Sequence, residues 1–229
     1  MPEPKFQRSR LSGAMYRHFK EDPLSKNQRD EDIYVGDSGM PKEELFPADG
    51  RTLNIGDPYN VIDLPNVVNI DMDPATFARR KGPMVKAMFP ILPFKDKSFK
   101  RIVSSWAVGY YEPTLGREET SLYYQAYFEE INRLLDKEAG VAYLWPHSDS
   151  VSPFFLDEAK RYISEGGAVL LTYINSSRFN YISIDDSFDI GSSIINKGIR
   201  VDTCVIFPKG ASPASIRRVT DIISKQTVS

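Results

Sequence analysis

The chain has 229 residues, with 29 basic and 31 acidic side chains, a formal net charge of −2 and a single cysteine, Cys204. One cysteine excludes an internal disulfide framework, and the balanced charge gives no electrostatic basis for generic binding to nucleic acid. No apolar run approaches the length of a transmembrane helix, so we expect no membrane partner. A chain of this length can form one α/β domain with a sizeable buried core.

The sequence also suggests a cellular compartment and a substrate class. Residues 1–5 lack the apolar core of a secretory signal, so we expect a cytoplasmic protein. The absence of a basic excess favours a small-molecule substrate over nucleic acid. The oligomeric state stays open.

Residues 1–49 differ from the rest of the chain because they are rich in charged and polar side chains and poor in aliphatic ones. We interpret them as an N-terminal extension to a main domain at 50–229. Within the extension, Leu11, Met15 and Phe19 recur at four-residue spacing, which predicts a short amphipathic helix ending near Asp22 and Pro23. Two interpretations stay open: a solvated arm packed on the core, or a lid over a substrate pocket.

The main domain opens with two apolar runs, LNIGDP at 53–58 and VVNIDMDP at 67–74, which predict two parallel strands. Gly56 lets the backbone pass close to a ligand, and Asp71 at the second strand tip can accept hydrogen bonds from a ribose diol. Nicotinamide-binding folds carry a triple-glycine turn and an acid about 20 residues later. The glycines and the spacing in this chain fall short of that pattern, so the match is to another family. About ten residues separate Pro58 from the end of the second strand, which leaves no room for a full crossover helix.

The pattern then alternates between helices and strands. We predict helices at 75–81, 118–135, 153–165 and 213–225, and strands at 101–105, 141–145, 168–174, 181–184 and 200–207. Pro74 suits the first turn of the helix at 75–81. Gly166 and Gly167 end the helix at 153–165.

Two further motifs identify a family. FPILPFKDKSF at 89–99, followed by an apolar run, resembles the "LPF-x-D-x-SF" segment before the fourth strand of class I S-adenosylmethionine-dependent methyltransferases. EEINRLLDKEAG at 129–140 resembles that family's "E-x-x-R-V-L-K-P-G-G" helix and turn. The resemblance covers residues 50–147 and fits the "methyltransferase type 11-like" branch with a short first crossover. It implies an α/β fold, a Rossmann-like methyltransferase three-layer sandwich with a mostly parallel twisted sheet, and S-adenosylmethionine as cofactor.

The resemblance also implies a cofactor site. Asn54, Gly56 and Asp57 close the first strand, and Asp57 can either cap the turn or face the cofactor's ammonium group. Asp71 would bind the ribose, and Met72 would offer an apolar face to the adenine. The remaining predicted cofactor residues are Phe89 and Leu92, which could cover the other adenine face or belong to the core, and Ser105.

Catalytic candidates follow the fourth and fifth strands. His147 lies just past the fifth strand, where it could act as a general base or cap a loop. Tyr110, with Tyr111 and Glu112 beside it, could position a substrate or serve packing. We predict no metal site, because the two histidines and the cysteine are far apart in sequence.

Three functions are compatible with these residues. The first is methyl transfer from S-adenosylmethionine to a small molecule. The second is a non-catalytic binding or scaffold protein that has lost the cofactor, because Asp57 and Pro58 stand where the family has its second glycine. The third is a cofactor-retaining enzyme of another reaction type.

Overall fold

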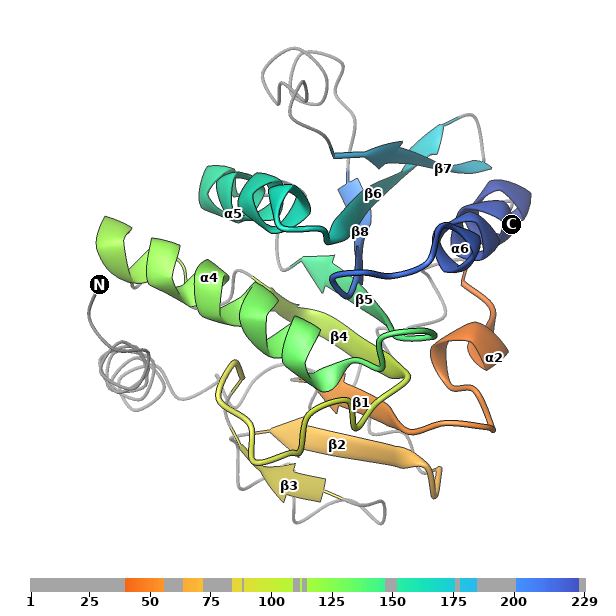
Figure 1. The fold of residues 1–229 in the computed structure, drawn as a ribbon, viewed down its shortest axis with the longest axis horizontal. Helices are drawn as coiled ribbons and strands as arrows, with labels where there is room; N and C mark the ends of the chain where they lie inside the picture. The colour runs from red at the N-terminus through yellow and green to blue at the C-terminus, as the bar shows by residue number, and fades with distance from the viewer. Residues whose placement is uncertain are drawn as a thin grey trace, which may run out of the picture.

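The computed structural model describes residues 40–55, 64–71, 84–87, 89–108, 112, 115–146, 152–175, 178–184 and 201–226. The helices in this part are α2 (Lys42–Leu45), α4 (Arg117–Leu134), α5 (Pro153–Ser164) and α6 (Pro213–Lys225). The strands are β1 (Thr52–Ile55), β2 (Val67–Asp71), β3 (Met84–Lys86), β4 (Arg101–Val108), β5 (Val141–Pro146), β6 (Ala168–Asn175), β7 (Arg178–Ser183) and β8 (Val201–Phe207). Figure 1 shows their arrangement.

The described strands form one sheet in the order β3-β2-β1-β4-β5-β8-β6-β7. β1 to β5 are mutually parallel, β8 runs antiparallel to both β5 and β6, and β7 runs antiparallel to β6. β6 therefore points the same way as β1 to β5, and the sheet is mostly parallel. The order reverses between β1 and β4, which is where open α/β sheets bind their ligands.

The connection from β1 to β2 is short. β1 ends at Ile55 and β2 begins at Val67, whose amide closes a turn onto the carbonyl of Leu64 at 3.0 Å. Within residues 64–71 the chain forms this turn and then the strand, and the stunted crossover stays a prediction for the residues before them. Residues 56–63 and the helix predicted at 75–81 lie outside the described residues, as does the helix predicted around Leu11 and Phe19.

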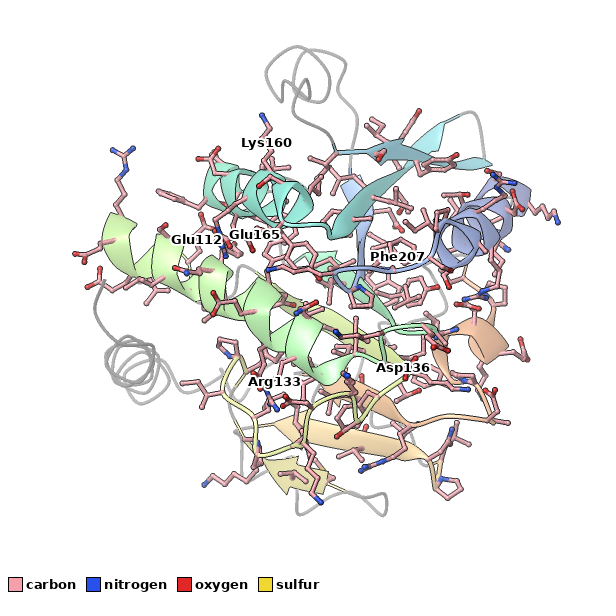
Figure 2. All side chains as sticks on the ribbon, in the orientation of Figure 1. Glu112, Arg133, Asp136, Lys160, Glu165 and Phe207 are labelled. Atoms are coloured by element: carbon pink, nitrogen blue, oxygen red, sulfur yellow. The ribbon has the colours of Figure 1, made fainter. Side chains whose placement is uncertain are left out.

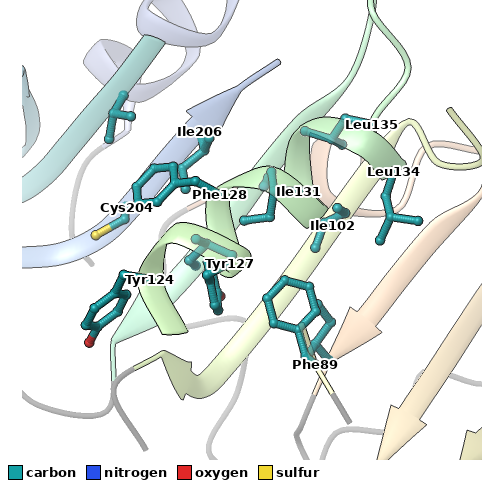
Figure 3. Close-up of a cluster of buried hydrophobic side chains, with 14 of the residues drawn as sticks. Phe89, Ile102, Tyr124, Tyr127, Phe128, Ile131, Leu134, Leu135, Cys204 and Ile206 are labelled. Atoms are coloured by element: carbon teal, nitrogen blue, oxygen red, sulfur yellow. The ribbon is translucent and has the colours of Figure 1, made fainter. Parts of the chain in front are cut away.

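Helices cover both faces of the sheet and give three layers. Side chains alternate between faces along a strand. Leu53 and Ile55 of β1 accordingly join the core under α4 and α5, while Val67 and Val103 pack on the side of α2 and α6. Figure 3 shows the first of these cores, where aromatic side chains of α4 lie over β4. The predicted three-layer α/β sandwich is confirmed.

The helices begin and pack as their sequences predict. α4 places Tyr123, Tyr127, Ile131 and Leu134 in the core at spacings of three and four residues. α5 begins after Ser152, whose hydroxyl accepts a hydrogen bond from the amide of Phe154, and Pro153 occupies the first turn. α6 repeats this start with its own Ser-Pro pair.

Two ends of the predicted strands differ from the observed ends by more than one residue. β4 continues three residues beyond the predicted end at Ser105, because an irregularity between Ser105 and Val108 lets it pair with Pro146 of β5. β7 begins at Arg178, earlier than predicted, because it pairs with β6 along its whole length.

The structure also contains α2 and β3, which the sequence patterns did not predict. α2 lies within the predicted extension, yet Leu45 and Phe46 are buried against the sheet. Its Glu44 is buried too, in an ion pair with Arg101 at 2.9 Å and another with Arg218 at 2.5 Å. Residues 40–49 therefore pack as part of the folded domain, whereas the predicted lid or arm role of residues 1–39 lies outside the described residues.

Candidate functional site

The candidate site lies at the edge of the sheet where the parallel strands end. Ile55 pairs with Ile70 of β2 and with Ser104 of β4, so the carboxyl ends of three strands are neighbours. β5 lies on the other side of β4, and Ser105 pairs with Trp145. Asp71 is the last residue of β2, and its strand neighbour is Lys86 at the end of β3. The structure thus brings the end of β1 at Ile55 and the end of β2 at Asp71 beside Ser104 and Ser105 of β4, which continues to Val108.

Several predicted site residues fall where the structure makes no statement. Gly56, Asp57, Met72, Tyr110 and His147 lie outside the described residues. Asp71 and Ser105 are described only as positions in β2 and β4, and their side chains are not. The predicted roles of all seven stay predictions.

Three predicted cofactor residues are buried. Asn54 donates a hydrogen bond of 2.9 Å from its side-chain amide to the side-chain oxygen of Asn69 on β2. Phe89 and Leu92 are 6% and 8% exposed in the core under α4, and the Phe89 ring packs edge-on against Tyr127 with centroids 4.4 Å apart. Of the two interpretations for Phe89 and Leu92, the structure places them in the core. Their contact with adenine stays a prediction.

The loop that carries the "LPF" motif is attached to α4 through the second family motif. Arg133 donates to the carbonyl oxygen of Phe94 at 2.6 Å and to the Asp96 carboxylate at 2.8 Å. The same guanidinium pairs with Glu130 at 2.6 Å, and Glu130 accepts a hydrogen bond from the amide of Leu92 at 3.2 Å. Glu130 and Arg133 are the acid and the arginine of the "E-x-x-R" motif. The two motifs therefore occur together because one holds the other; Figure 2 labels Arg133 at this end of α4.

A second polar cluster lies beyond the end of β4. The Glu112 carboxylate accepts one hydrogen bond from the Tyr124 hydroxyl at 2.6 Å and another from the Ser152 hydroxyl at 2.5 Å. Tyr124 belongs to α4 and Ser152 precedes α5, so Glu112 joins both helices near the strand ends (Figure 2). Burial, followed by the adjacent Glu112 carboxylate, raises the pKa of Tyr124 far above its ordinary value. Tyr124 therefore keeps its proton and donates a hydrogen bond to Glu112.

Three buried polar atoms near this edge form no hydrogen bond of good geometry with any residue that the structure describes. They are the hydroxyls of Ser104 and Tyr127 and the indole nitrogen of Trp145. Burial raises the pKa of Tyr127, and the nearby Ser104 hydroxyl partly offsets that rise. These hydroxyls lie among the apolar side chains under α4, where they stay protonated and neutral.

Sequence reasoning named Glu112 but missed what holds it. The sequence patterns give no role to Tyr124 or Ser152. The Ser-Pro pair before α5 is a helix-start signal that identifies Ser152 as the N-cap. No sequence pattern connects either residue to Glu112, which is 12 positions from Tyr124 and 40 from Ser152.

Two other kinds of site are absent from the described residues. That part of the chain contains no group of three or more His, Cys, Asp or Glu side chains placed to hold a metal ion. It also contains no helix with the length and apolar character needed to cross a membrane. The described site offers hydrogen bonding and charge through Glu112.

Several solved structures are similar to this chain at low sequence identity and with TM-scores below 0.5. A candidate methyltransferase from Haloferax volcanii, solved with the Trm112 methyltransferase activator, is 15% identical with a TM-score of 0.43, over 82% of this chain and 97% of that one. An S-adenosylmethionine-dependent methyltransferase from Thermotoga maritima is 12% identical with a TM-score of 0.39, over 88% and 96%. A protein from Pyrococcus horikoshii is 14% identical with a TM-score of 0.36, over 91% and 93%.

Three other similar structures are matched over 38%, 49% and 42% of their own chains, so this chain covers less than half of each. No protein-family model matches the chain, and no curated protein sequence matches it. The family resemblance in the motifs and the observed strand order agree on the class I methyltransferase fold.

Proposed function

We propose that this chain, which has the class I methyltransferase fold, transfers a methyl group from S-adenosylmethionine to a small-molecule acceptor. The observation that carries the proposal is the meeting of the β1, β2 and β4 ends at the reversal of strand order. The acidic Asp71 ends β2 there, beside the exit of β1. An acid at that position suits a ribose diol, because a carboxylate accepts two hydrogen bonds from neighbouring hydroxyls.

In this proposal each part of the edge has a role. Asp71 binds the ribose, and the backbone at Gly56 lies close to the methionine part of the cofactor. Ser105 lies between the cofactor and the acceptor. The cofactor supplies an electrophilic methyl group on a sulfonium. Protein side chains then have to align the acceptor with that methyl group and accommodate any proton that the acceptor loses. Tyr110 and His147 follow β4 and β5, so they are the predicted residues on the acceptor side.

The attachment of the "LPF" loop supports this arrangement. Arg133 and Glu130 fix the backbone at Leu92 and Phe94 through hydrogen bonds to carbonyl and amide groups. The loop directly precedes β4, so the hydrogen bonds from Arg133 and Glu130 also fix the start of this strand. The other end of β4 lies at the site. A rigid support of this kind is what an aligned displacement reaction requires, because small misplacements cost rate.

The alternative of a scaffold without cofactor rests on Asp57 and Pro58. Proline offers no amide hydrogen and fixes φ, so this turn is less adaptable than a glycine turn. A third function, another reaction on the same bound cofactor, would leave cofactor binding intact and transfer no methyl group.

Incubation with S-adenosylmethionine labelled in its methyl group separates these functions. The purified protein would be mixed with a cell extract that has been divided by ultrafiltration into small molecules and macromolecules. We expect label in the small-molecule fraction. Label in protein or nucleic acid alone would contradict the proposed acceptor class. Absence of label would favour another reaction if S-adenosylhomocysteine still binds, and a scaffold if it does not.

A further inference from the structure

The Glu112 carboxylate is held by neutral donors only, as far as the described residues show. Tyr124 donates to one carboxylate oxygen and Ser152 to the other. Neither donor carries a positive charge, and no lysine or arginine of the described chain forms an ion pair with Glu112. A partly buried negative charge is costly unless something compensates it. Glu112 thus presents a fixed negative charge whose natural partner is a cation.

The position of Glu112 separates it from the predicted cofactor strands. Glu112 follows β4, and Ser152 lies between β5 and α5. β5 borders β4 on the side opposite to β1 and β2. The ribose position at Asp71 and the carboxylate of Glu112 therefore lie on opposite sides of β4 along the same edge. If the cofactor occupies the β1 and β2 ends, Glu112 stands on the side where the acceptor enters.

We propose that Glu112 binds the methyl acceptor and that this acceptor is an amine. This inference rests on the proposed methyl transfer and names the substrate class for it. Glu112 orients the acceptor by attracting its cationic or partially positive nitrogen. Tyr124 and Ser152 are positioning residues, because they hold the two carboxylate oxygens and do not themselves meet the acceptor.

The movement of charge in the reaction explains the preference for nitrogen. The nitrogen lone pair of the neutral amine attacks the methyl carbon, and the carbon–sulfur bond breaks with its electron pair going to sulfur. The sulfonium becomes a neutral thioether, the positive charge moves to nitrogen, and an N–H proton then leaves to solvent. A fixed carboxylate beside the nitrogen stabilises that developing charge. An oxygen acceptor reacting as an anion would be repelled by the same carboxylate.

The carboxylate does not act as the proton acceptor. A carboxylate is a far weaker base than an aliphatic amine, so it cannot hold a proton in competition with one. Its contribution is binding and orientation. The amine has to lose its first proton to water before attack, which makes the rate rise with pH.

The alternative is a purely structural role, in which Glu112 only connects α4 with α5. Glu112→Gln distinguishes the two, because the amide has the same shape and can bond to both hydroxyls while lacking the charge. Glu112→Asp is the complementary variant, since it keeps the charge on a shorter side chain. Asp157→Asn serves as the matched control, because Asp157 is an exposed carboxylate on α5 and its substitution changes the net charge equally.

The experiment uses the full chain, S-adenosylmethionine labelled in its methyl group and the small-molecule ultrafiltrate of a cell extract as the probe. Labelled product is separated by cation exchange at neutral pH. We expect the label in the cationic fraction, which holds methylated amines. Glu112→Gln should lower the rate of labelling about 10- to 100-fold, the loss typical of one charge-assisted contact, while Glu112→Asp keeps part of it and Asp157→Asn keeps it all.

Affinity for S-adenosylhomocysteine, measured on each variant, keeps the outcomes distinct. Parent and Glu112→Gln should bind it equally. Label in the neutral or anionic fraction, unchanged labelling by Glu112→Gln, or no labelled small molecule from protein that binds S-adenosylhomocysteine would each overturn the amine proposal. Failure of the parent to bind S-adenosylhomocysteine would instead reject the proposed methyl transfer itself.

Discussion

Arg133, near the end of α4, donates a hydrogen bond of 2.6 Å to the carbonyl oxygen of Phe94, which lies 39 residues earlier in the chain. The same guanidinium forms an ion pair with Glu130, whose side chain is only 1% exposed. The ion pair with Glu130 and the hydrogen bond to Asp96 raise the pKa of Arg133, so it stays charged. The contact joins the helix motif to the loop motif, and its energy can be measured.

Arg133→Met should destabilise the fold by about 2–4 kcal/mol, because it leaves Glu130 as a buried charge without its cation. Urea unfolding at neutral pH measures the loss. The control is Arg161→Met on α5, where the arginine side chain is 36% exposed and its partners Glu158, Glu165 and Glu129 are 11%, 37% and 46% exposed, against 1% for Glu130. That variant should lose less than about 1 kcal/mol. Equal losses in the two variants would show that Arg133 contributes no more than a surface arginine.

Glu44 should make stability depend on acid. Its burial raises the pKa of the carboxyl, but hydrogen bonds from Arg218 and Tyr143 and the charge of Arg101 outweigh that effect and lower it overall. A pKa that is lower in the folded chain gives stability that is present above the unfolded value, about 4.3 for glutamate, and is lost as pH falls through the folded value.

Glu44→Gln tests this dependence. The variant should be less stable than the parent at pH 7, by about 3 kcal/mol, because Arg101 and Arg218 lose their common partner. The difference between parent and variant should shrink as pH drops below about 4.3. Urea midpoints measured at several pH values give both curves. Parallel curves across the acid range would contradict the assignment.

Much of the fold follows from local sequence patterns. The elements that could not be predicted have one physical cause in common. α4, α5 and α6 have clear stripes, N-caps or breakers, so their predicted bounds agree with the structure to within one residue. α2 has four residues in a polar stretch, and its buried Glu44 has partners at Arg101, Tyr143 and Arg218. β3 has three residues and no alternation. Elements this short are determined by distant contacts, which a local pattern does not contain.

The candidate site divides in the same way. The neighbouring positions Asp71 and Ser105 could be predicted because strand patterns and family motifs mark them, although β4 continues to Val108. The attachment of Glu112 to Tyr124 and Ser152 could not, because it joins three separate elements. Asn54, Phe89 and Leu92 stand in motifs that suggest cofactor contact, yet burial is decided by what packs on them from α4 and from β2.

Replacement of Asp71 should weaken cofactor binding. Asp71→Ala removes one charge-assisted acceptor for the ribose diol, which costs about 1.5–3 kcal/mol, or about one to two decades in affinity. Equilibrium dialysis with labelled S-adenosylmethionine measures the change, and Asp157→Ala on α5 provides a carboxylate control. A folded Asp71→Ala that binds as well as the parent would place the ribose elsewhere.

The turn after β1 should limit affinity. Pro58 fixes φ and has no amide hydrogen, and Asp57 brings negative charge near the carboxylate of the cofactor. The double variant Asp57→Gly with Pro58→Gly should therefore bind S-adenosylhomocysteine more tightly than the parent. Its thermal midpoint should fall, because added glycine gives the unfolded chain more freedom. Unchanged affinity in the variant would mean that the turn does not face the cofactor.

Binding of the cofactor product to the unmodified chain is the most direct test of the account. Titration of S-adenosylhomocysteine into the purified protein in a calorimeter should give a saturable curve for one site per chain. In Asp71→Ala the binding curve should be lost, or saturation should require a higher concentration of S-adenosylhomocysteine. A parent protein with no saturable heat would contradict the claim that the edge formed by β1, β2 and β4 holds this cofactor.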